Sequence, residues 1–488
     1  MHVAFVSPFD FPILSYGLTS VMTAVRRAGH RVSLVDTALL AGPLVEVAAR
    51  RLAELRPQVV GFPAMSTNLE RQLEIARLVR RALPEAHLLW GGTHALLLPE
   101  DLIARPEVDA VCVTEGEHAV PEHLATLGEA GAPRAVAGIW RVVGGRVLRG
   151  PERPLPEDLD ALAWPDWSLW DLEEHQRRHL WVQGALPIAT SRGCPLSCSF
   201  CSNATLRRRL PGRYCRSRSA ASVIAEVQHN LRLWPGFRFL HVNDDSFGID
   251  RRHLREFCGA YREAGLHRVL PWGCQTPVSA IDDEWARLAA DAGCVLINPG
   301  LESGVEEHRL RVLNKPIRDA DYRRAAAALA RHGIICAYNM IIGTPDEGLG
   351  SLARSLSFAY SLRPLWVHPT LLIALPETPM RALLEREQLL DPRRRHAQMP
   401  RARTRHLGLL PLDAVMALLR VERATRILAV GLRTFGASFL GRAWRRARGA
   451  DGDGPAYLRS FFLLHLERMI TQEMIGAVSR RRGWAWRF

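Results

Sequence analysis

The stretch Ser191-Arg-Gly-Cys-Pro-Leu-Ser-Cys-Ser-Phe-Cys-Ser-Asn203 is the feature around which the rest of the chain is organised. It places Cys194, Cys198 and Cys201 in one short loop, with three residues and then two residues between them. Cys thiolates are the ligands of iron–sulfur clusters. Three of them hold three corners of a cubic cluster and leave its fourth iron open. Zinc is the competing metal, but a structural zinc site takes four ligands, usually as two separated pairs. The loop therefore predicts an iron–sulfur centre that can bind a further ligand.

The length and composition of the chain predict a multidomain protein of a reducing compartment. The chain has 488 residues, a formal net charge of +14 and nine cysteines, and its length corresponds to about two to four domains. The excess of arginine has several explanations: genome composition, an anionic substrate, nucleic acid or an anionic membrane face. The first residues resemble a strand rather than a signal peptide, and no apolar run reaches the ~18 residues of a membrane span. Because thiols in a reducing cytoplasm serve metals and catalysis, we predict a cytoplasmic location.

Strands and helices alternate through residues 1–135, which predicts a doubly wound, Rossmann-like parallel sheet. The predicted strands are apolar runs at residues 3–7, 30–35, 59–63, 87–90 and 111–114. Ligands of such sheets bind beyond the carboxyl ends of the strands, where the loops are rich in Gly, Ser and Thr and let a large ligand approach the backbone. No GxGxxG follows the first strand, which disfavours a dinucleotide. A purely regulatory or packing domain remains as an alternative.

Residues 136–184 are predicted to connect this domain to the next one. Residues 136–149 have the pattern of a small hairpin with Gly144-Gly145 as its turn. A strip rich in proline and tryptophan follows, without a regular period. We interpret its tryptophans as packing anchors.

Residues 185–400 repeat a strand and a helix six times, which predicts a partial (β/α)6 TIM-type barrel with its chemistry at the carboxyl ends of the strands. The predicted strands lie at residues 186–190, 237–242, 269–275, 295–298, 334–342 and 366–374. Polar residues and glycines cluster at these ends, namely Asp244, Asp245, Gln275, Glu302, Ser303 and Gly343. Packing alone does not require this placement, so it favours a functional site at this end.

The arrangement Cys-x3-Cys-x-aromatic-Cys, formed by Cys194, Cys198, Phe200 and Cys201, resembles the hallmark of the radical SAM superfamily. The resemblance implies that the three cysteines are metal ligands and catalytic residues of a 4Fe–4S cluster. The open iron would bind SAM, and an electron from the cluster would cleave SAM to a 5′-deoxyadenosyl radical. By their positions in the family's motifs, the implied SAM contacts are Phe200, Asp244, Asp245, Ser246, Glu302, Ser303, Gly343 and Arg218, with Arg216 as a second candidate for the SAM carboxylate.

The first third of the chain resembles the cobalamin-binding domain that precedes the catalytic domain in one large class of radical SAM enzymes. The residues that carry this resemblance are Trp90-Gly-Gly-Thr-His94, Pro99-Glu100, Val108-Asp109 and Glu115-Gly-Glu117. The Asp-x-His-x-x-Gly signature of an axial histidine is absent, so the lower face of cobalt would be open or capped by another side chain. The implied cobalamin contacts are Ser66, Thr67, Gly91, Gly92, Thr93, Glu115, Gly116 and Glu117.

Residues 401–488 are predicted to form a helical C-terminal extension, with helices at 410–432 and 457–478. Basic residues alternate there with Trp and Phe. This pattern suits either a cap on the barrel or a peripheral contact with an anionic membrane surface. No nucleic-acid module appears in the sequence, so we do not expect nucleic acid as a partner.

Together the resemblances imply a class B, cobalamin-dependent radical SAM methyltransferase. It would methylate an unactivated carbon, or a phosphinate phosphorus, of a small-molecule, natural-product or lipid-like substrate. An external donor of the flavodoxin or ferredoxin type would reduce the cluster. Two alternatives stay open: ring closure, oxidation or rearrangement with the same cofactors, and a cluster-bearing redox or ligand sensor without turnover.

Overall fold

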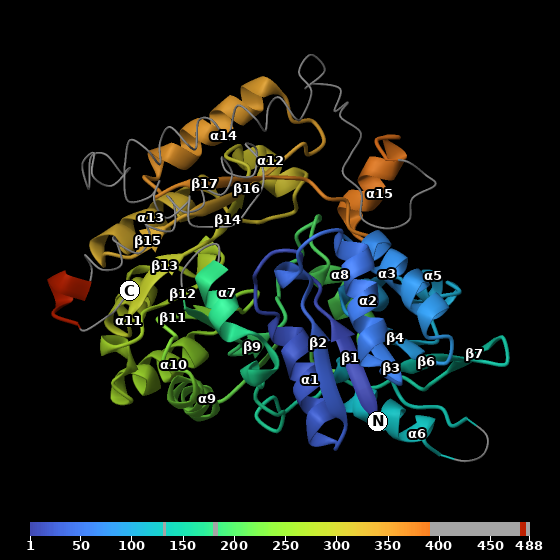
Figure 1. Cartoon of the computed structure of the whole chain (residues 1–488). Coiled ribbons are helices and arrows are strands. Elements are labelled where there is room, and N and C mark those ends of the chain that lie inside the picture. Colours follow the sequence, from blue (N-terminus) through green and yellow to red (C-terminus); the bar gives the residue numbers. More distant parts are fainter. Residues whose placement is uncertain (130–132, 179–183, 391–478, 485–488) are drawn as a thin grey trace.

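The computed structural model describes residues 1–129, 133–178, 184–390 and 479–484. Figure 1 shows two α/β units side by side, the first in blue to teal and the second in green to orange. The predicted α/β class is confirmed. The helices predicted at 410–432 and 457–478, and with them the predicted membrane contact, lie outside the described residues. Within the described part of the chain, no helix has both the length and the apolar character needed to cross a bilayer.

The first unit is built on a seven-stranded sheet with the strand order β2-β1-β3-β4-β5-β6-β7. Strands β1 to β5 are parallel, as predicted, whereas β6 and β7 form an antiparallel hairpin on the edge at β5. The strands are β1 (His2–Val6), β2 (Arg31–Val35), β3 (Val59–Pro63), β4 (His87–Gly91), β5 (Ala110–Cys112), β6 (Ile139–Val143) and β7 (Arg146–Arg149). The hairpin of the predicted linker thus pairs with the first sheet, where it covers an edge of unpaired backbone groups. The domain boundaries themselves stay a prediction.

Helices cover both faces of this sheet, and strand β1 shows why. Val3 and Phe5 share a core with α1 and α6, while Ala4 and Val6 share another with α2 and α3. Successive side chains of a strand point to opposite faces, so a strand buried on both sides is apolar throughout. The helices are α1 (Tyr16–Arg27), α2 (Leu44–Leu55), α3 (Leu69–Ala82), α4 (Thr93–Leu97), α5 (Pro99–Ile103) and α6 (Gly116–Leu127).

The tryptophan-rich strip after the hairpin is anchored on α1. Trp167 and Trp170 are both buried. The Trp170 indole N–H donates to Thr19 Oγ1 at 2.8 Å, and the backbone N–H of Asp166 donates to Thr23 Oγ1 at 2.8 Å. The packing role predicted for these two tryptophans is confirmed. Helix α7 (Leu172–Arg178) follows them.

The second unit contains two parallel sheets, with the orders β15-β13-β12-β11-β8 and β14-β16-β17. All six predicted strands are present, but the fourth continues after a break as β14 and the fifth is split into β15 and β16. Pro299, at the first break, has no N–H to donate to a ladder. Closure of these strands into a TIM-type barrel stays a prediction. The strands are β8 (Ala185–Ile188), β11 (Phe239–Val242), β12 (Trp272–Cys274), β13 (Cys294–Ile297), β14 (Gly300–Glu302), β15 (Ile335–Cys336), β16 (Tyr338–Ile342) and β17 (Val367–Leu371).

Helices cover one face of the five-stranded sheet and leave the other face for a cavity. Leu186 and Leu240 belong to the core beneath α9, α10 and α11, while Ala185 and Phe239 face the opposite way. At the amino-terminal end of that second face, Trp484 packs against Ala185 and Phe239. The helices of this unit are α8 (Asn203–Arg209), α9 (Ala220–Leu233), α10 (Arg251–Glu263), α11 (Asp283–Asp291), α12 (Glu306–Arg311), α13 (Asp319–Arg331), α14 (Leu349–Ser361) and α15 (Pro379–Arg386).

Candidate active site

The three cysteines of the cluster loop lie together between the short strand β9 (Ser191–Arg192) and α8. Cys194 and Cys198 are buried and Cys201 is half-buried. Burial raises the pKa of all three thiols. The pKa of Cys198 rises to about 11, because burial and the neighbouring Cys201 and Cys194 outweigh the opposing effect of Lys315. The thiols are therefore neutral on their own, and a bound metal must displace their protons.

The spacing of these thiols suits a cluster better than a single ion. Among the described residues, no three His, Cys, Asp or Glu side chains lie close enough together to hold one metal ion. In a cubic cluster each thiolate binds a different iron, so its ligands need not converge on one point. The donor set of Cys194, Cys198 and Cys201 thus fits a 4Fe–4S cluster and does not fit a structural zinc ion.

Asp244 fixes the cluster loop to the end of β8. Its carboxylate accepts hydrogen bonds from the Thr190 N–H at 2.7 Å, from Thr190 Oγ1 at 2.6 Å and from Ser191 Oγ at 2.6 Å. Burial raises the pKa of Asp244, and these hydrogen bonds oppose that effect. The carboxylate is fully used in holding the loop, so its predicted contact with SAM stays a prediction.

The far side of the loop is held by residues from other elements. Arg207 on α8 donates to Cys194 O at 3.1 Å and to Ser197 Oγ at 2.7 Å. Asn314 Nδ2 donates to Ser197 O at 2.7 Å. Phe200 is half-buried in the small core next to α15. The loop is therefore fixed along its whole length before any ligand binds.

Asp245 and Ser246 follow Asp244 but point to different surroundings. Asp245 lines the cleft between the two units. The cleft walls shield its carboxylate from water in part, which raises its pKa. Ser246 is buried, and its hydroxyl donates to Gly193 O at 3.4 Å. Of the predicted second-strand residues, Asp245 is the one that faces the cleft.

Glu302 forms a buried ion pair that reaches the cluster loop. Lys315 Nζ donates to Glu302 Oε1 at 2.9 Å and to Gly300 O at 2.6 Å. The pair lies near the cluster loop, because the Ser199 N–H of that loop donates to Leu313 O at 2.9 Å, two residues before Lys315. The ammonium group of Lys315 partly offsets the rise in the pKa of Cys198. Glu302 has a positive φ of 61°, which is costly for a residue with a side chain. Next to it, Ser303 Oγ lies 3.3 Å from Ser355 Oγ on α14.

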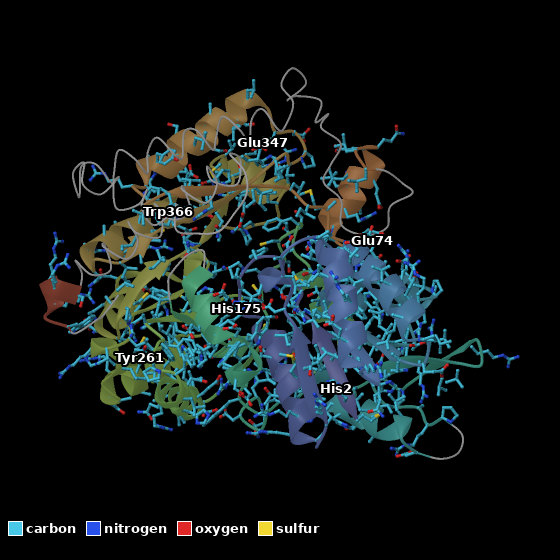
Figure 2. All side chains as sticks on the ribbon, in the orientation of Figure 1. His2, Glu74, His175, Tyr261, Glu347 and Trp366 are labelled. Atoms are coloured by element: carbon cyan, nitrogen blue, oxygen red, sulfur yellow. The ribbon has the colours of Figure 1, made fainter. Side chains whose placement is uncertain are left out.

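Gly343 ends β16 in a tight turn closed by a buried acid. Its φ is +84°, which favours glycine. Its N–H donates to Glu347 Oε2 at 2.7 Å. Burial raises the pKa of Glu347 to about 7. Figure 2 labels this side chain near α14.

The two arginines predicted for the SAM carboxylate already have partners in the protein. Arg218 is buried, pairs with Glu226 and donates to Ala189 O at 3.1 Å. Arg216 pairs with Glu115 of the first unit and donates to Pro156 O at 2.8 Å. A role on SAM stays a prediction for both, and Arg216 lines the cleft whereas Arg218 does not.

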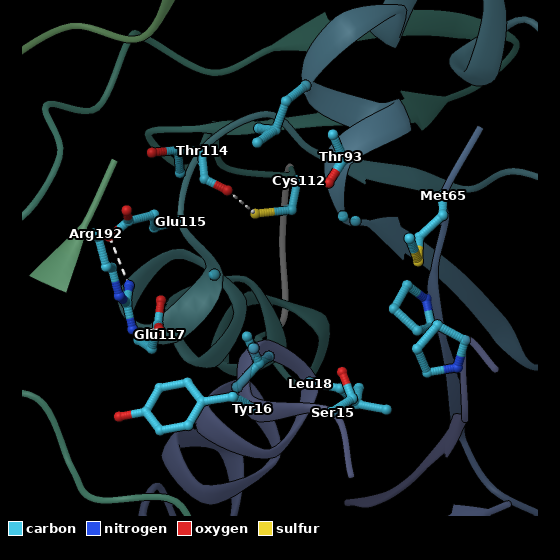
Figure 3. A pocket seen from close by; sticks show the side chains of 18 of the residues that line it. Ser15, Tyr16, Leu18, Met65, Thr93, Cys112, Thr114, Glu115, Glu117 and Arg192 are labelled. Atoms are coloured by element: carbon cyan, nitrogen blue, oxygen red, sulfur yellow. Dashed lines mark hydrogen bonds and ion pairs between the residues drawn. The ribbon is translucent and has the colours of Figure 1, made fainter. Parts of the chain in front are cut away.

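A cleft of about 440 Å³ lies between the units and is lined by residues of both. Figure 3 shows this pocket with Tyr16, Thr93 and Glu115 around it. Six of the residues predicted to contact cobalamin line it, namely Gly91, Gly92, Thr93, Glu115, Gly116 and Glu117. From the second unit it is lined by Ser191, Arg192, Gly193, Asn243 and Asp245, among others. The carboxyl ends of the first sheet therefore face the cluster loop across one cleft.

Gly92 is required by the shape of this cleft. Its φ is +86°, and a Cβ there would lie 2.7 Å from Ala64 O. Ser66 and Thr67, in contrast, are not among the residues that line the cleft, although Met65 of the same loop is. Ser66 Oγ instead lies 2.9 Å from Nδ1 of the buried His94. No histidine occurs among the described residues lining the cleft.

Arg192 joins the two units at the rim of the cleft. Its guanidinium pairs with Glu115 at 2.8 Å and with Glu117 at 2.6 Å, and Figure 3 shows it beside both carboxylates. Burial by itself would raise the pKa of Glu117, but Arg192 outweighs that effect and holds this pKa below its usual value. Ser20 Oγ also donates to Glu117, at 2.8 Å.

Sequence reasoning missed Arg192, Tyr16 and Lys315 as site residues. Arg192 stands inside the quoted stretch, two residues before Cys194. That position next to the cluster cysteines was the feature of the sequence that could have identified it. Lys315 is a rare lysine in an arginine-rich chain, which also marks it. For Tyr16 no pattern in the sequence indicates that the first helix begins at the cleft.

Two family models match the chain, one for each unit. The B12 binding domain matches residues 4–124 and the Radical SAM superfamily matches residues 188–359. The fold and the cluster loop thus define a radical SAM protein. More particularly, the chain belongs to the cobalamin-binding radical SAM proteins, in which a B12 binding domain precedes the radical SAM domain. The B12 binding domain is the domain that binds cobalamin, and the radical SAM domain is the one that binds SAM and a 4Fe–4S cluster.

Individual relatives agree with this assignment. The chain is 30% identical to the cytidylyl-2-hydroxyethylphosphonate methyltransferase of Streptomyces wedmorensis, over 63% of each protein. It is 27% identical to the anaerobic magnesium-protoporphyrin IX monomethyl ester cyclase of Cereibacter sphaeroides, over 69% of this chain and 54% of the cyclase. The chain thus spans less than two thirds of either relative. The fold is similar to that of the radical SAM methyltransferase TsrM from Kitasatospora setae with cobalamin and a [4Fe-4S] cluster bound. That similarity has a TM-score of 0.66 at 20% identity and covers 79% of this chain and 78% of TsrM.

Proposed function

We propose that the protein is a cobalamin-dependent radical SAM methyltransferase acting on a small-molecule substrate. When bound, SAM and the cluster supply a radical that removes a hydrogen atom, and cobalamin supplies the methyl group. The observation that carries the proposal is the shared cleft. Glycines and acids from the carboxyl ends of the first sheet line the same cleft as Gly193 of the cluster loop and Asp245 after β11.

In this proposal the residues of the chain hold the ligands and keep water away. Cys194, Cys198 and Cys201 hold the cluster. Asp244 keeps the loop in place through its three hydrogen bonds. Gly91 and Gly92 line the cleft without side chains, which lets a large flat ligand approach the backbone at the sheet ends.

The test is anaerobic reconstitution of the full chain with iron, sulfide and cobalamin, followed by reduction in the presence of SAM. We expect both 5′-deoxyadenosine and S-adenosylhomocysteine, the second being the product of methyl donation. The Cys198→Ala variant should lose 5′-deoxyadenosine, since one corner of the cluster loses its ligand. Retention of 5′-deoxyadenosine in this variant would contradict the cluster assignment.

Cys215→Ala is the matched control. Cys215 is a half-buried cysteine close in sequence to the loop but outside its spacing. This variant should keep the iron content and the 5′-deoxyadenosine yield of the natural sequence. If it loses the cluster instead, the ligand set is larger than the three cysteines.

A second candidate function keeps both cofactors but closes a ring, as the name of the relative from C. sphaeroides indicates for that protein. Methyl-labelled SAM separates the two. A methyltransferase transfers the label to its product, whereas a cyclase forms 5′-deoxyadenosine without labelled product. A sensor without turnover would form neither.

The electron for the cluster comes, in our proposal, from a separate protein of the flavodoxin or ferredoxin type. The support is that the described chain offers one three-cysteine loop, whose open iron is needed for SAM. Reduced flavodoxin should replace the chemical reductant in the assay above. We propose a cytoplasmic location on the chemistry of the thiols.

A further inference from the structure

A second cavity, of about 360 Å³, adjoins the cleft and lies on the open face of the five-stranded sheet. One wall comes from alternate residues of β8, β11, β12 and β13, and the other from residues 9–17 of the first unit. Phe9, Tyr16 and Asn243 line both hollows, so the cavity is next to the cleft that we assign to cobalamin. Its volume lies in the range of small-molecule sites, roughly 300–1,000 Å³.

This cavity is not the predicted site of SAM. Glu302, Ser303 and Gly343, which the family's motifs place near SAM, do not line it. Neither do the cluster cysteines. The space between the sheet and residues 9–17 is therefore available to a further molecule.

No charged side chain lines the cavity among the described residues. The apolar part of the wall comes from Ile13 and Leu14 on one side and Phe239 and Leu296 on the other. The adjoining cleft is different, because Glu115, Glu117, Arg192, Arg216 and Asp245 all line it. Burying an ion without a partner is costly, so this wall disfavours a charged occupant.

The sheet side of the cavity contributes four neutral polar side chains, His241, Asn243, Gln275 and Asn298, and the facing segment adds Ser15 and Tyr16. His241 and Asn298 are half-buried, and Asn243 and Gln275 are exposed. Burial lowers the pKa of His241 to about 4, so its ring is neutral at neutral pH. Their donors and acceptors can therefore reach a molecule that occupies the cavity.

We propose that this cavity is the substrate site and that it selects an uncharged molecule with an apolar body and amide, carbonyl or hydroxyl groups. His241, Gln275 and Asn298 would bind those groups, and Phe239 and Leu296 would contact the body. The inference rests on the proposed function and adds the class of its substrate. It separates this chain from its relative in S. wedmorensis, whose name gives an anionic phosphonate, because no described cation lines the cavity.

The test is binding of matched neutral and anionic probes to the reconstituted holoenzyme. Indole-3-acetamide and indole-3-acetate have nearly the same shape and differ in charge, and calorimetry measures the affinity of each. We expect the amide to bind at least tenfold more tightly. Equal or tighter binding of the carboxylate, or no binding of the amide, overturns the inference.

Two variants locate the binding in the cavity. Gln275→Leu removes hydrogen-bonding atoms at nearly constant size and should weaken amide binding at least fivefold. Gln228→Leu makes the same change on α9, outside the cavity, and should leave the affinity unchanged. Equal affinities in both variants would place the binding elsewhere.

The same preparations are assayed for 5′-deoxyadenosine. If they form it but do not bind the amide, the inference about the substrate is wrong and the proposed function stands. If they bind the amide but form no 5′-deoxyadenosine, the proposed function fails instead.

Discussion

At the scale of single residues, we expect the buried ion pair of Lys315 and Glu302 to have a large effect on the stability of the fold. Both side chains are buried, and their charged atoms lie 2.9 Å apart. Lys315→Met would leave the Glu302 carboxylate buried without its partner. Breaking such a pair costs about 3–5 kcal/mol, so we expect a loss of that order in the free energy of unfolding, measured by urea denaturation.

The control for this prediction is an exposed pair. Arg311 and Glu307 lie 2.6 Å apart on the surface of α12. Exposed pairs of this kind contribute about 0.5 kcal/mol or less, so Arg311→Met should have little effect. If the two variants are equally stable, the buried pair does not stabilise the fold.

Glu347 predicts a specific dependence of stability on pH. Its pKa is raised by burial from 4.5 to about 7, so the folded state holds this proton more tightly than the unfolded state. The contribution of Glu347 to stability therefore falls as the pH rises from about 4.5 to 7, and then stays low.

Glu347→Gln mimics the protonated acid and keeps an oxygen for the Gly343 N–H. The difference in unfolding free energy between this variant and the natural sequence should grow in favour of the variant between pH 5 and pH 8. Urea denaturation at both values measures it. A difference that does not change with pH would show that Glu347 titrates near its ordinary pKa.

At the scale of elements, the turn between β4 and α4 shapes the cleft. Gly92→Ala would place a Cβ at 2.7 Å from Ala64 O in a backbone conformation with φ of +86°. We expect this variant to retain less cobalamin after gel filtration, as measured by visible absorbance. Gly29→Ala is the control, because Gly29 has the same φ of +86° but open space around it. It should lose stability without losing cobalamin.

The elements that could be predicted from the sequence are those with a regular apolar period and an abrupt end. The runs that became β1, β3 and β4 are buried on both faces. β3 and β4 end in Pro63 and Gly91, and Pro8 follows shortly after β1, so both the type and the position of these strands could be recognised. The break at Pro299 could not, because it depends on β14 pairing with β16, a partner distant in sequence.

The site residues divide in the same way, into those that a local sequence pattern predicts and those that it does not. The cluster cysteines are encoded in one loop, and their spacing alone indicates their chemistry. The ion pairs of Arg192 with Glu115 and Glu117 join residues more than seventy positions apart, and no local pattern records such a contact. Likewise, Arg218 pairs with the buried Glu226 on the next helix. Sequence spacing does not predict this pair, because the pair depends on both side chains being buried together.

At the scale of the whole molecule, Arg192 links the two units across the cleft. Arg192→Leu would leave Glu117, which is 9% exposed, without its main partner. We expect the units to separate more readily, which would speed the release of cobalamin and increase hydrogen exchange in α1 and α6. Arg26→Leu removes a more exposed ion pair, with Asp166, and should leave the release rate unchanged.

The contact made by residues 479–484 has a consequence for the order in which the protein is completed. Trp484 packs on Ala185, Phe239 and Leu296, three residues that line the second cavity, and Arg482 donates to His332 O at 2.7 Å. A nascent chain that has been translated only through the cluster loop holds all three of its cysteines but lacks this wall. The second cavity gains this wall only when residues 479–484 have been translated, long after the cysteine loop.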